Sequence, residues 1–163
     1  MKIKKTKFKD LLIVEQKNNV DNRGSLRETF NDKILKKKFI FEYCTTSKKN
    51  VFRGFHFQVK NEQSKYVNVV KGKILDVVID LRKNSKTFGR IFSIILSKKN
   101  ALGLFIPAGF AHAYYSYDKE NVIYYKLDNY YAPKFESGII YNDTTINFKW
   151  PNKKMTVSKK DKN

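Results

Sequence analysis

The chain has 163 residues, 41% apolar and 15% aromatic, with a formal net charge of +19 at pH 7. These values predict one folded domain over 1–163, exclude a disordered chain, and would suit a nucleic-acid partner if the lysines formed one stripe. They are spread instead over termini, turns and one predicted helix, so we expect a solvated basic surface and no nucleic-acid partner. We also expect a soluble cytoplasmic protein without a membrane segment, because no apolar run could span a bilayer, no secretory signal begins the chain, and its single cysteine is Cys44.

The predicted elements begin with a helix near 31–39 and continue as short strands. The predicted strands are 40–46, 51–58, 65–71, 73–81, 90–97, 103–107, 111–118, 121–128 and 138–149. Turns are expected at 70–74 and 106–109. Many short strands separated by turn signals indicate a sandwich or barrel. We divide the chain into an N-terminal part of strands and a helix (1–50), a barrel (51–150) and a C-terminal tail that carries Asp161 (151–163).

Two of these strands carry polar residues that require an explanation. His56, one of only two histidines, lies between two phenylalanines in "VFRGFHFQ" (51–58). A half-buried neutral histidine with both ring nitrogens bonded would explain it in structural terms. In "ILDVVIDL" (74–81), alternation places Asp76 on the face opposite a wholly apolar one. A buried Asp needs a cation or donors, so this face should line a polar interior, with Lys65 one candidate partner.

The stretch "IPAGFAH" (106–112) has the P-x-G-x-x-H spacing of the second motif of cupin barrels. Many cupins bind a metal, but His56 and His112 are the only imidazoles, and no cluster of Asp, Glu or Cys has ligand spacing. The sequence therefore predicts no catalytic metal.

Taken together, six segments resemble the dTDP-4-dehydrorhamnose 3,5-epimerases, a family of non-metal cupins. They follow the family's order along nearly the whole chain, at 21–30, 51–58, 63–90, 106–115, 124–143 and 150–161. The resemblance implies an all-β fold, a cupin-type double-stranded β-helix (jelly-roll barrel) with one or two short helices. It also implies a homodimer with shared sites, because the segment that carries Arg23 typically crosses to the partner subunit.

The resemblance implies an isomerase that inverts C3, C5 or both in a nucleotide-diphospho-4-keto-6-deoxysugar, for cell-surface polysaccharide precursors. The C4 ketone acidifies the neighbouring C–H bonds, and removal of a proton gives an enolate. Reprotonation on the other face inverts the carbon. This chemistry needs a base, an acid across the ring and a cation or donor at the enolate oxygen. No cofactor is expected, and no GxGxxG segment is present to hold a dinucleotide.

Catalytic roles follow from the resemblance, residue by residue. His56 would be the general base, and Asp161 would orient its ring. Tyr125 would be the acid on the opposite face. Lys65 would stabilise the enolate oxygen, and Asp76 would hold this lysine in place.

The resemblance implies substrate contacts as well. Its predicted binding residues are Arg23 and Arg53 for the diphosphate, Glu28 and Tyr131 for the nucleotide base, His112 for the sugar, and Gln58. In a regular strand Arg53 and His56 would point to opposite faces, because they are three residues apart. Gly54 permits a bulge that would bring both inward.

The chain departs from the family pattern at several positions. Phe41, Tyr43 and Thr45 stand where Gln, Asn and Ser are usual, which predicts a bulkier pocket. Leu26 replaces an aromatic residue that often stacks on the base. Asp161 lies two residues from the end, where it could fray. These departures leave the sugar and the nucleotide (dTDP or GDP) open. The alternatives are a mono-epimerase, a 3,4-ketoisomerase and a non-catalytic sugar-nucleotide-binding cupin.

Overall fold

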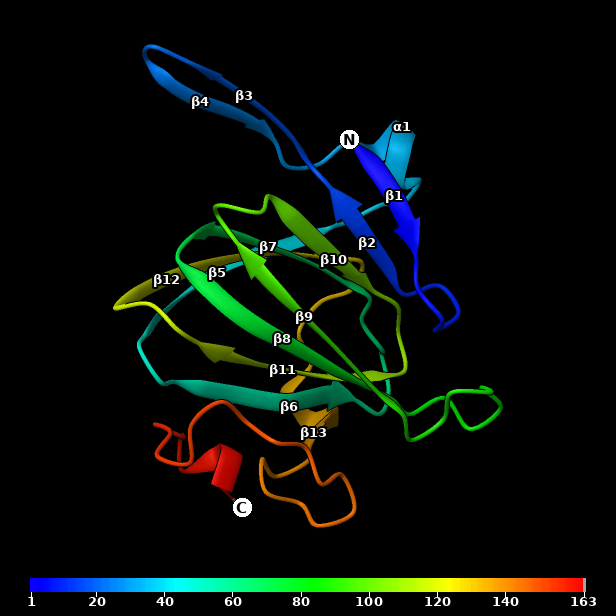
Figure 1. The fold of residues 1–163 in the computed structure, drawn as a ribbon. Coiled ribbons are helices and arrows are strands. Elements are labelled where there is room, and N and C mark those ends of the chain that lie inside the picture. Colours follow the sequence, from blue (N-terminus) through cyan, green and yellow to red (C-terminus); the bar gives the residue numbers. More distant parts are fainter. Residues whose placement is uncertain (163) are drawn as a thin grey trace.

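The computed structural model describes residues 1–162, and strands dominate it (Figure 1). The first sheet has six strands in the order β1 (Lys2–Lys5), β2 (Leu12–Glu15), β10 (Leu102–Ile106), β7 (Lys65–Lys71), β12 (Glu120–Leu127) and β5 (Phe41–Lys48). The second has five strands in the order β13 (Glu136–Gly138), β6 (Phe52–Gln58), β11 (Phe110–Ser116), β8 (Lys73–Asp80) and β9 (Ile91–Ser97). The interleaved antiparallel order confirms the predicted cupin-type jelly roll.

The main apolar core lies between these two sheets. Side chains of β7, β10 and β12 meet those of β8, β9 and β11 there, including Val67, Leu104, Ile74, Val78 and Leu96. The predicted alternation of β8 is confirmed, because Ile74 and Val78 face this core while Val77 belongs to a second apolar cluster. The interior is therefore apolar over much of its length, and polar groups occupy only part of it.

The second apolar cluster covers the outer face of the smaller sheet. Phe52, Phe55 and Val77 are buried there beneath side chains from 139–157, among them Trp150. The strand predicted over 138–149 is wrong, because β13 ends at Gly138 and turns follow it. In the second of these turns the Asp143 carboxylate accepts a hydrogen bond from the Thr145 backbone N–H, 2.8 Å away. Apolar residues in this stretch therefore serve to cover the sheet rather than to extend it.

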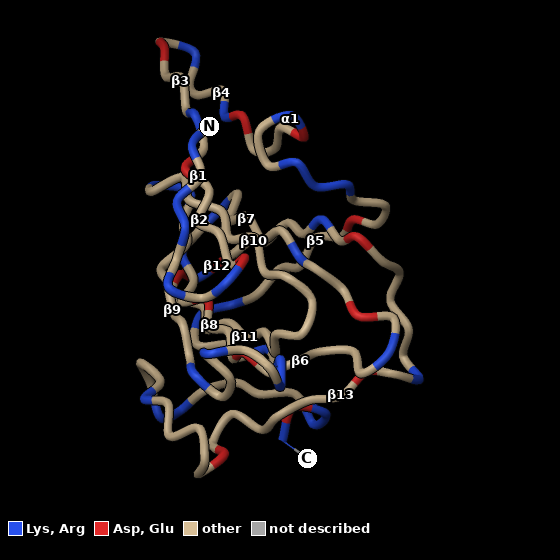
Figure 2. The backbone as a smooth tube through the Cα atoms, turned by 90° about the vertical axis from the view of Figure 1, so that its right-hand side faces the viewer, with Lys and Arg blue, Asp and Glu red and all other residues tan. Residues whose placement is uncertain are grey.

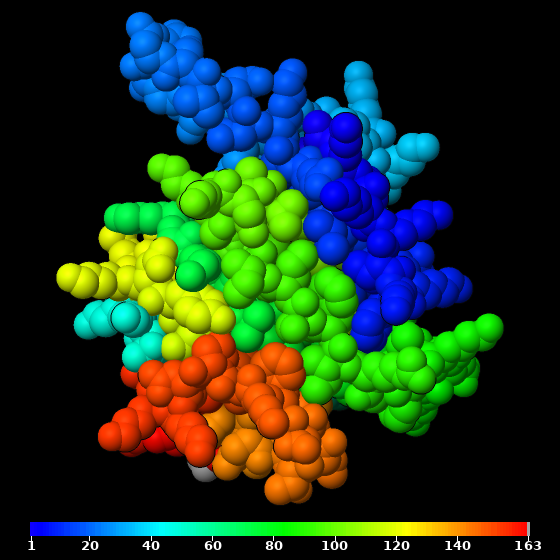
Figure 3. Space-filling model, in the orientation of Figure 1, coloured from blue at the N-terminus to red at the C-terminus, as the bar shows by residue number. Residues whose placement is uncertain are grey.

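Three features of the N-terminal part differ from the sequence prediction. Strands were predicted in this part, but not the ranges of β1 and β2, which extend the larger sheet. The helix α1 (Asp32–Leu35) is shorter than predicted, because Lys36 adopts a left-handed conformation (φ 53°) that ends it. The ranges and pairing of β3 (Lys17–Asp21) and β4 (Gly24–Glu28) were not predicted either; they form a hairpin that pairs only with itself and projects from the body (Figures 1 and 3).

Charge is distributed along the chain, as expected. Figure 2 shows Lys and Arg on the N-terminal strands, the connecting turns and the C-terminal segment, without concentration on one element. Within residues 1–162, no helix is long and apolar enough to cross a membrane.

Candidate active site

A cavity of about 270 Å³ opens between the two sheets at one end of the barrel. One wall comes from β6 and β13 of the smaller sheet, and the other from β5 and β7 of the larger sheet. The lining residues are Phe41, Tyr43, His56, Phe57, Gln58, Gln63, Lys65, Tyr131 and Glu136. The structure thus brings three predicted site residues to one cavity: the general base His56, the enolate-stabilising Lys65, and Tyr131, which was expected to stack on the nucleobase.

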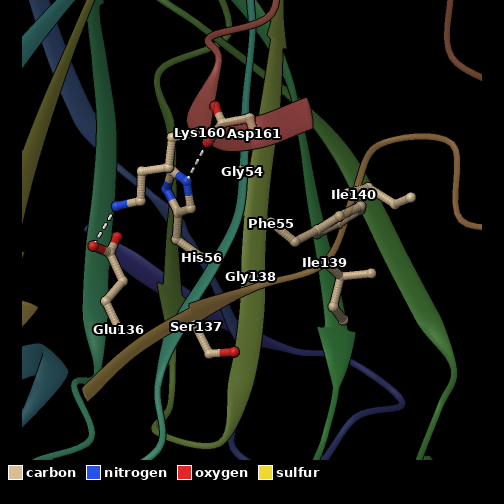
Figure 4. A pocket seen from close by; sticks show the side chains of 10 residues that line it. All are labelled: Gly54, Phe55, His56, Glu136, Ser137, Gly138, Ile139, Ile140, Lys160 and Asp161. Atoms are coloured by element: carbon tan, nitrogen blue, oxygen red, sulfur yellow. Dashed lines mark hydrogen bonds and ion pairs between the residues drawn. The ribbon is translucent and has the colours of Figure 1, made fainter. Parts of the chain in front are cut away.

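His56 is held from behind by the C-terminal segment. Its Nε2 lies 2.7 Å from Oδ1 of Asp161, which is carried by the short helical turn η2 (Lys160–Lys162) (Figure 4). The Asp161 side chain is 5% exposed and that of His56 is 31% exposed. A carboxylate that accepts a hydrogen bond from Nε2–H fixes the tautomer and leaves Nδ1 free to accept a proton. The geometry is that of a base and its orienting group.

The bulge predicted at Gly54 is present and explains how the strand presents His56. In the pairing of β6 with β11, His56 lies opposite His112 and Arg53 lies opposite Tyr114, so the register shifts between them. Gly54 has φ 122°, and a Cβ there would come within 2.5 Å of the Ala113 Cβ. Only glycine fits this position, and Arg53 and His56 consequently share a face.

Lys65 occupies the opposite wall, at the start of β7. Burial lowers the pKa of its ammonium to about 8, and the negative charges of Glu136 and Asp76 oppose this shift. A lysine that is held in a poorly solvated site with its charge largely kept is suited to stabilise a negative oxygen on a bound molecule.

Asp76 and His112 form a second, fully interior pair. The Asp76 carboxylate is buried inside the barrel, and its Oδ2 lies 2.8 Å from Nε2 of His112. The direct partner of Asp76 is therefore His112, and not the lysine that we considered from the sequence. Among the described residues, Oδ1 of Asp76 has no hydrogen-bond partner. The negative charge of Asp76 nevertheless acts on Lys65, where it opposes the lowering of the lysine pKa.

Tyr125 lies beneath the cavity wall. It is 3% exposed, and its ring stacks on that of Tyr43, with centroids 4.7 Å apart. The His112 ring meets Tyr125 edge-on at 6.1 Å. Burial is the main reason that the pKa of Tyr125 is raised well above its usual value. Of these two phenols, Tyr43 is the one that lines the cavity.

The predicted binding residues on the barrel take different positions. Arg53 is exposed and donates from Nε to Oγ of Ser47 at 3.0 Å. The Gln58 amide is used by backbone: its Oε1 accepts from the Ala132 N–H at 2.8 Å, and its Nε2 donates to the Asn61 carbonyl at 2.6 Å. Gln58 thereby supports the loop that carries Tyr131, and it also lines the cavity.

The structure does not bring Arg23 and Glu28 to this cavity. Arg23 is at the tip of the β3–β4 hairpin, where its side chain is 86% exposed and pairs with Asp21 at 2.7 Å. Glu28 accepts a hydrogen bond from the Asn31 side chain at 2.7 Å. A role for these two residues in binding requires the hairpin of one chain to reach the cavity of another.

Glu136 is a site residue that sequence reasoning missed. It lines both the main cavity and a smaller hollow of about 140 Å³ behind His56. Its carboxylate accepts a hydrogen bond from the Lys160 ammonium (Figure 4). It accepts a second from the Tyr131 hydroxyl. Glu136 therefore ties the C-terminal turn with Asp161 to the loop with Tyr131. Glu136 lies in the segment 124–143 that resembles the family, which could have pointed to it. Nothing local in that segment distinguishes it from an ordinary surface glutamate.

These groups suit proton transfer next to a carbonyl group. An oriented imidazole and an ammonium face one space from opposite walls, and phenols lie along it. Within residues 1–162, no group of three or more His, Cys, Asp or Glu side chains is placed to hold a metal ion.

Comparison with known proteins gives a consistent result. Residues 5–163 match the family described as dTDP-4-dehydrorhamnose 3,5-epimerase. The chain is 38% identical to the dTDP-4-dehydrorhamnose 3,5-epimerase of Methanothermobacter thermautotrophicus, over 98% of this chain and 90% of the relative. It superimposes with a TM-score of 0.94 on the crystal structure of the Bacillus anthracis epimerase with TDP and PPi bound, at 34% identity, covering 98% of this chain and 95% of that one.

A second solved structure comes from Legionella pneumophila, a dTDP-6-deoxy-D-glucose-3,5-epimerase in complex with dTDP-4-keto-L-rhamnose. Its TM-score is 0.92 at 35% identity, covering 98% of this chain and 88% of that one. With the matched profile spanning nearly the whole chain, this chain belongs to the dTDP-4-dehydrorhamnose 3,5-epimerase family.

Proposed function

We propose that this chain inverts C3 and C5 of a dTDP-4-keto-6-deoxysugar, as part of making a deoxysugar precursor of cell-surface polysaccharide. Family membership supports the reaction class, and the thymidine nucleotides bound to the Bacillus and Legionella relatives support dTDP. The cavity of about 270 Å³ is slightly smaller than sites for drug-sized molecules, which start near 300 Å³. It therefore suits the sugar ring, with the nucleotide bound nearer the surface beside Tyr131.

In this proposal His56 removes a proton from the carbon next to the C4 ketone. Asp161 keeps the ring in the tautomer with a free Nδ1 and stabilises the imidazolium that forms. The Lys65 ammonium stabilises the enolate oxygen. A phenol from the larger sheet returns a proton to the opposite face of the carbon. Tyr125 is the expected donor, because it occupies the sequence position of the family's acid. The Arg53 guanidinium is available at the surface for the diphosphate.

The observation that carries this proposal is the His56–Asp161 pair, 2.7 Å apart, on the same cavity as Lys65. An ordinary buried histidine would have both nitrogens occupied by the protein and would not face a cavity with a lysine opposite. Its partner comes from the far end of the chain, 105 residues away, so local sequence does not account for the contact.

Deuterium exchange tests the proposal. In D₂O, the wild-type chain should introduce label at C3 and C5 of dTDP-4-keto-6-deoxyglucose and form the inverted sugar. His56→Ala should abolish exchange at both carbons while it still binds dTDP, since the nucleotide contacts are elsewhere. Label at one carbon only would indicate a mono-epimerase, and no label with any 4-keto-6-deoxysugar nucleotide would overturn the enzymatic assignment.

We further propose a homodimer in which the β3–β4 hairpin completes the partner's site. The hairpin makes no sheet with its own barrel, and its side chains Val20 and Leu26 are each 73% exposed. Arg23 at its tip would then meet the diphosphate in the other subunit. Mixing inactive Arg23→Ala and His56→Ala chains should restore activity, because a mixed dimer has one intact site. Absence of restoration in dimers shown to be mixed would contradict a shared site.

The cytoplasmic location stays part of this proposal, since a sugar-nucleotide substrate is expected where such nucleotides are made. The single cysteine, Cys44, is exposed and free, which is compatible with a reducing compartment.

A further inference from the structure

Tyr125, the proton donor of the proposed reaction, is nearly closed to water, since only 3% of it is exposed. Once this phenol has given its proton to the enolate, a phenolate is left inside the barrel, where an unpaired charge is costly. The base is in a different position, because 31% of the His56 side chain is exposed and can exchange protons with solvent. The acid therefore needs a means of recovering its proton that the base does not need.

The proposed reaction makes this recovery a recurring step. Inversion of C3 and then of C5 uses the acid twice while one sugar is bound, and every later turnover uses it again. After each inversion the imidazolium must lose a proton and the phenolate must gain one. While the sugar fills the cavity, it also stands between the phenolate and the solvent on that side. A path that reaches the acid from its other side would separate recovery of the proton from release of the sugar.

A line of hydroxyl groups leads away from Tyr125 on that other side. The Thr45 side chain on β5 hydrogen-bonds the Tyr125 phenol, and this contact opposes the rise in pKa that burial causes. The Oγ1 atom of Thr45 lies 3.1 Å from the hydroxyl of Tyr114, which lies 2.8 Å from Oγ of Ser47. Tyr114 comes from β11, so its ring spans from the smaller sheet to β5 of the larger sheet (Figure 1). One partner would satisfy a buried phenol, whereas Tyr114 has a hydroxyl on each side.

The outer end of this line lies beside Arg53 at the surface. Ser47 is 3% exposed, and its Oγ accepts a hydrogen bond from Nε of the exposed Arg53 at 3.0 Å. A guanidinium can only donate, so the Ser47 hydrogen is free to point to Tyr114, and that of Tyr114 to Thr45. In this orientation Thr45 donates to Tyr125, whose own O–H stays available for the substrate. The polarity of the line thus suits delivery of a proton to Tyr125.

We infer that the hydroxyls of Thr45, Tyr114 and Ser47 form a proton relay, which returns a proton to Tyr125 from water near Arg53 after each inversion. This inference rests on the proposed function and adds to it three residues that act on the reaction through Tyr125.

The transfers balance without an added reactant. The Tyr125 O–H bond breaks as a C–H bond forms at the enolate carbon, which leaves a phenolate. The Thr45 proton moves to the phenolate oxygen, each hydroxyl of the relay is resupplied by the next, and a water molecule at Ser47 supplies the last proton. The hydroxide that this water becomes is neutralised by the proton that the His56 imidazolium releases to solvent. One proton has then passed from base to acid through water, and no group is oxidised or reduced.

Deletion of single hydroxyls tests the relay. Tyr114→Phe removes the middle hydroxyl and keeps the ring in the core. Tyr115→Phe is the matched control, because Tyr115 is the next residue on the same strand, is similarly buried, and donates its hydroxyl proton to Oδ1 of Asn50 at 2.5 Å, outside the relay. Ser47→Ala interrupts the relay one link further out, and it carries the test if Tyr114→Phe does not fold.

Four quantities would be measured for each variant, with dTDP-4-keto-6-deoxyglucose as the substrate. They are the affinity for dTDP, the rate of the first inversion with protein in excess, the steady-state rate in H₂O and in D₂O, and the ratio of singly to doubly inverted sugar.

Tyr114→Phe should bind dTDP normally and complete the first inversion within about twofold of the wild-type rate, because Tyr125 begins with its proton. The steady-state rate should fall about tenfold, and singly inverted sugar should accumulate, because Tyr125 then waits for a proton. The steady-state solvent isotope effect should rise for the same reason. Ser47→Ala should show the same kinetic pattern, and Tyr115→Phe should match the wild type. In a chain that inverts one carbon only, the defect would appear as a burst of one product per site followed by slow turnover.

Equal losses in the first inversion and in the steady state would indicate a packing defect and would overturn the relay. A wild-type steady-state rate in either relay variant that folds would overturn it too. In both cases an active wild type leaves the proposed function intact. A wild-type chain that exchanges no deuterium with any 4-keto-6-deoxysugar nucleotide would remove both.

Discussion

The Lys65 ammonium should set the alkaline limit of the reaction. Burial lowers its pKa to about 8, and the positive charge is needed where the enolate oxygen forms. With this pKa, about 90% of the free protein carries the charge at pH 7 and about 10% at pH 9. We therefore expect kcat/KM for inversion to fall about tenfold between these two pH values.

The assay is the rate of inverted sugar formation at low substrate concentration between pH 6 and pH 10. Lys65→Met should be strongly impaired and should lack the fall near pH 8. Lys65→Arg is the informative control, because a guanidinium keeps its charge throughout this range. Lys65→Arg should be slower than the wild type at pH 7, yet lose little further activity up to pH 9. A wild-type profile that stays flat to pH 9, or an Arg variant with the same fall, would refute the reasoning.

The same lowered pKa has a consequence for stability. Between pH 8 and 10.5 the unfolded chain binds a proton at this lysine that the folded chain has released, so stability rises with pH in this window. Below it, keeping the charge in the folded state costs up to about 3 kcal/mol. Lys65→Met should thus be more stable than the wild type at pH 7, and this advantage should shrink toward pH 10.5. An advantage that is constant across the window would show that Lys65 is not charged at a cost in the folded protein.

Three further substitutions test the site and its support. Asp161→Asn should lower kcat about 100-fold without changing dTDP affinity, because the His56 ring loses its orienting carboxylate, and a normal kcat would exclude that role. Lys160→Met should lower kcat about threefold, because the C-terminal turn loses its half-exposed ion pair with Glu136, which is worth less than about 1 kcal/mol. The control Lys159→Met removes a neighbouring exposed charge and should leave kcat unchanged. Gly54→Ala should reduce the free energy of unfolding by about 3 kcal/mol or prevent folding, and a denaturation midpoint equal to that of the wild type would contradict the bulge geometry.

Much of the barrel could be predicted because its strands have local signals. Alternation in β8 correctly placed Asp76 inside, and glycine at position 54 correctly indicated a bulge. What alternation could not provide was the partner of each group. Asp76 meets His112 because β8 and β11 are neighbours in the sheet, and that pairing is a property of the topology.

Where prediction failed, the residues lacked a local reason for their structure. The strands β3 and β4 are polar and fully or largely exposed, so no period of two in hydrophobicity marks them. In 139–149 the opposite holds: apolar residues suggested a strand, but they are apolar because they cover the outer face of the smaller sheet. A burial requirement is visible in sequence, whereas the backbone geometry that meets it is not.

The C-terminal segment shows how far local sequence can mislead about a catalytic group. A lysine-rich stretch with one aspartate near its end has the composition of a solvated tail, yet three contacts hold it in place. Thr156 pairs with Val51 beside β6, Lys160 binds Glu136, and Asp161 reaches His56. Each contact lies on or next to the strand that carries the base or on the strand paired with it. The segment is therefore ordered by the site it completes, and loss of these contacts should release the orienting carboxylate before it unfolds the barrel.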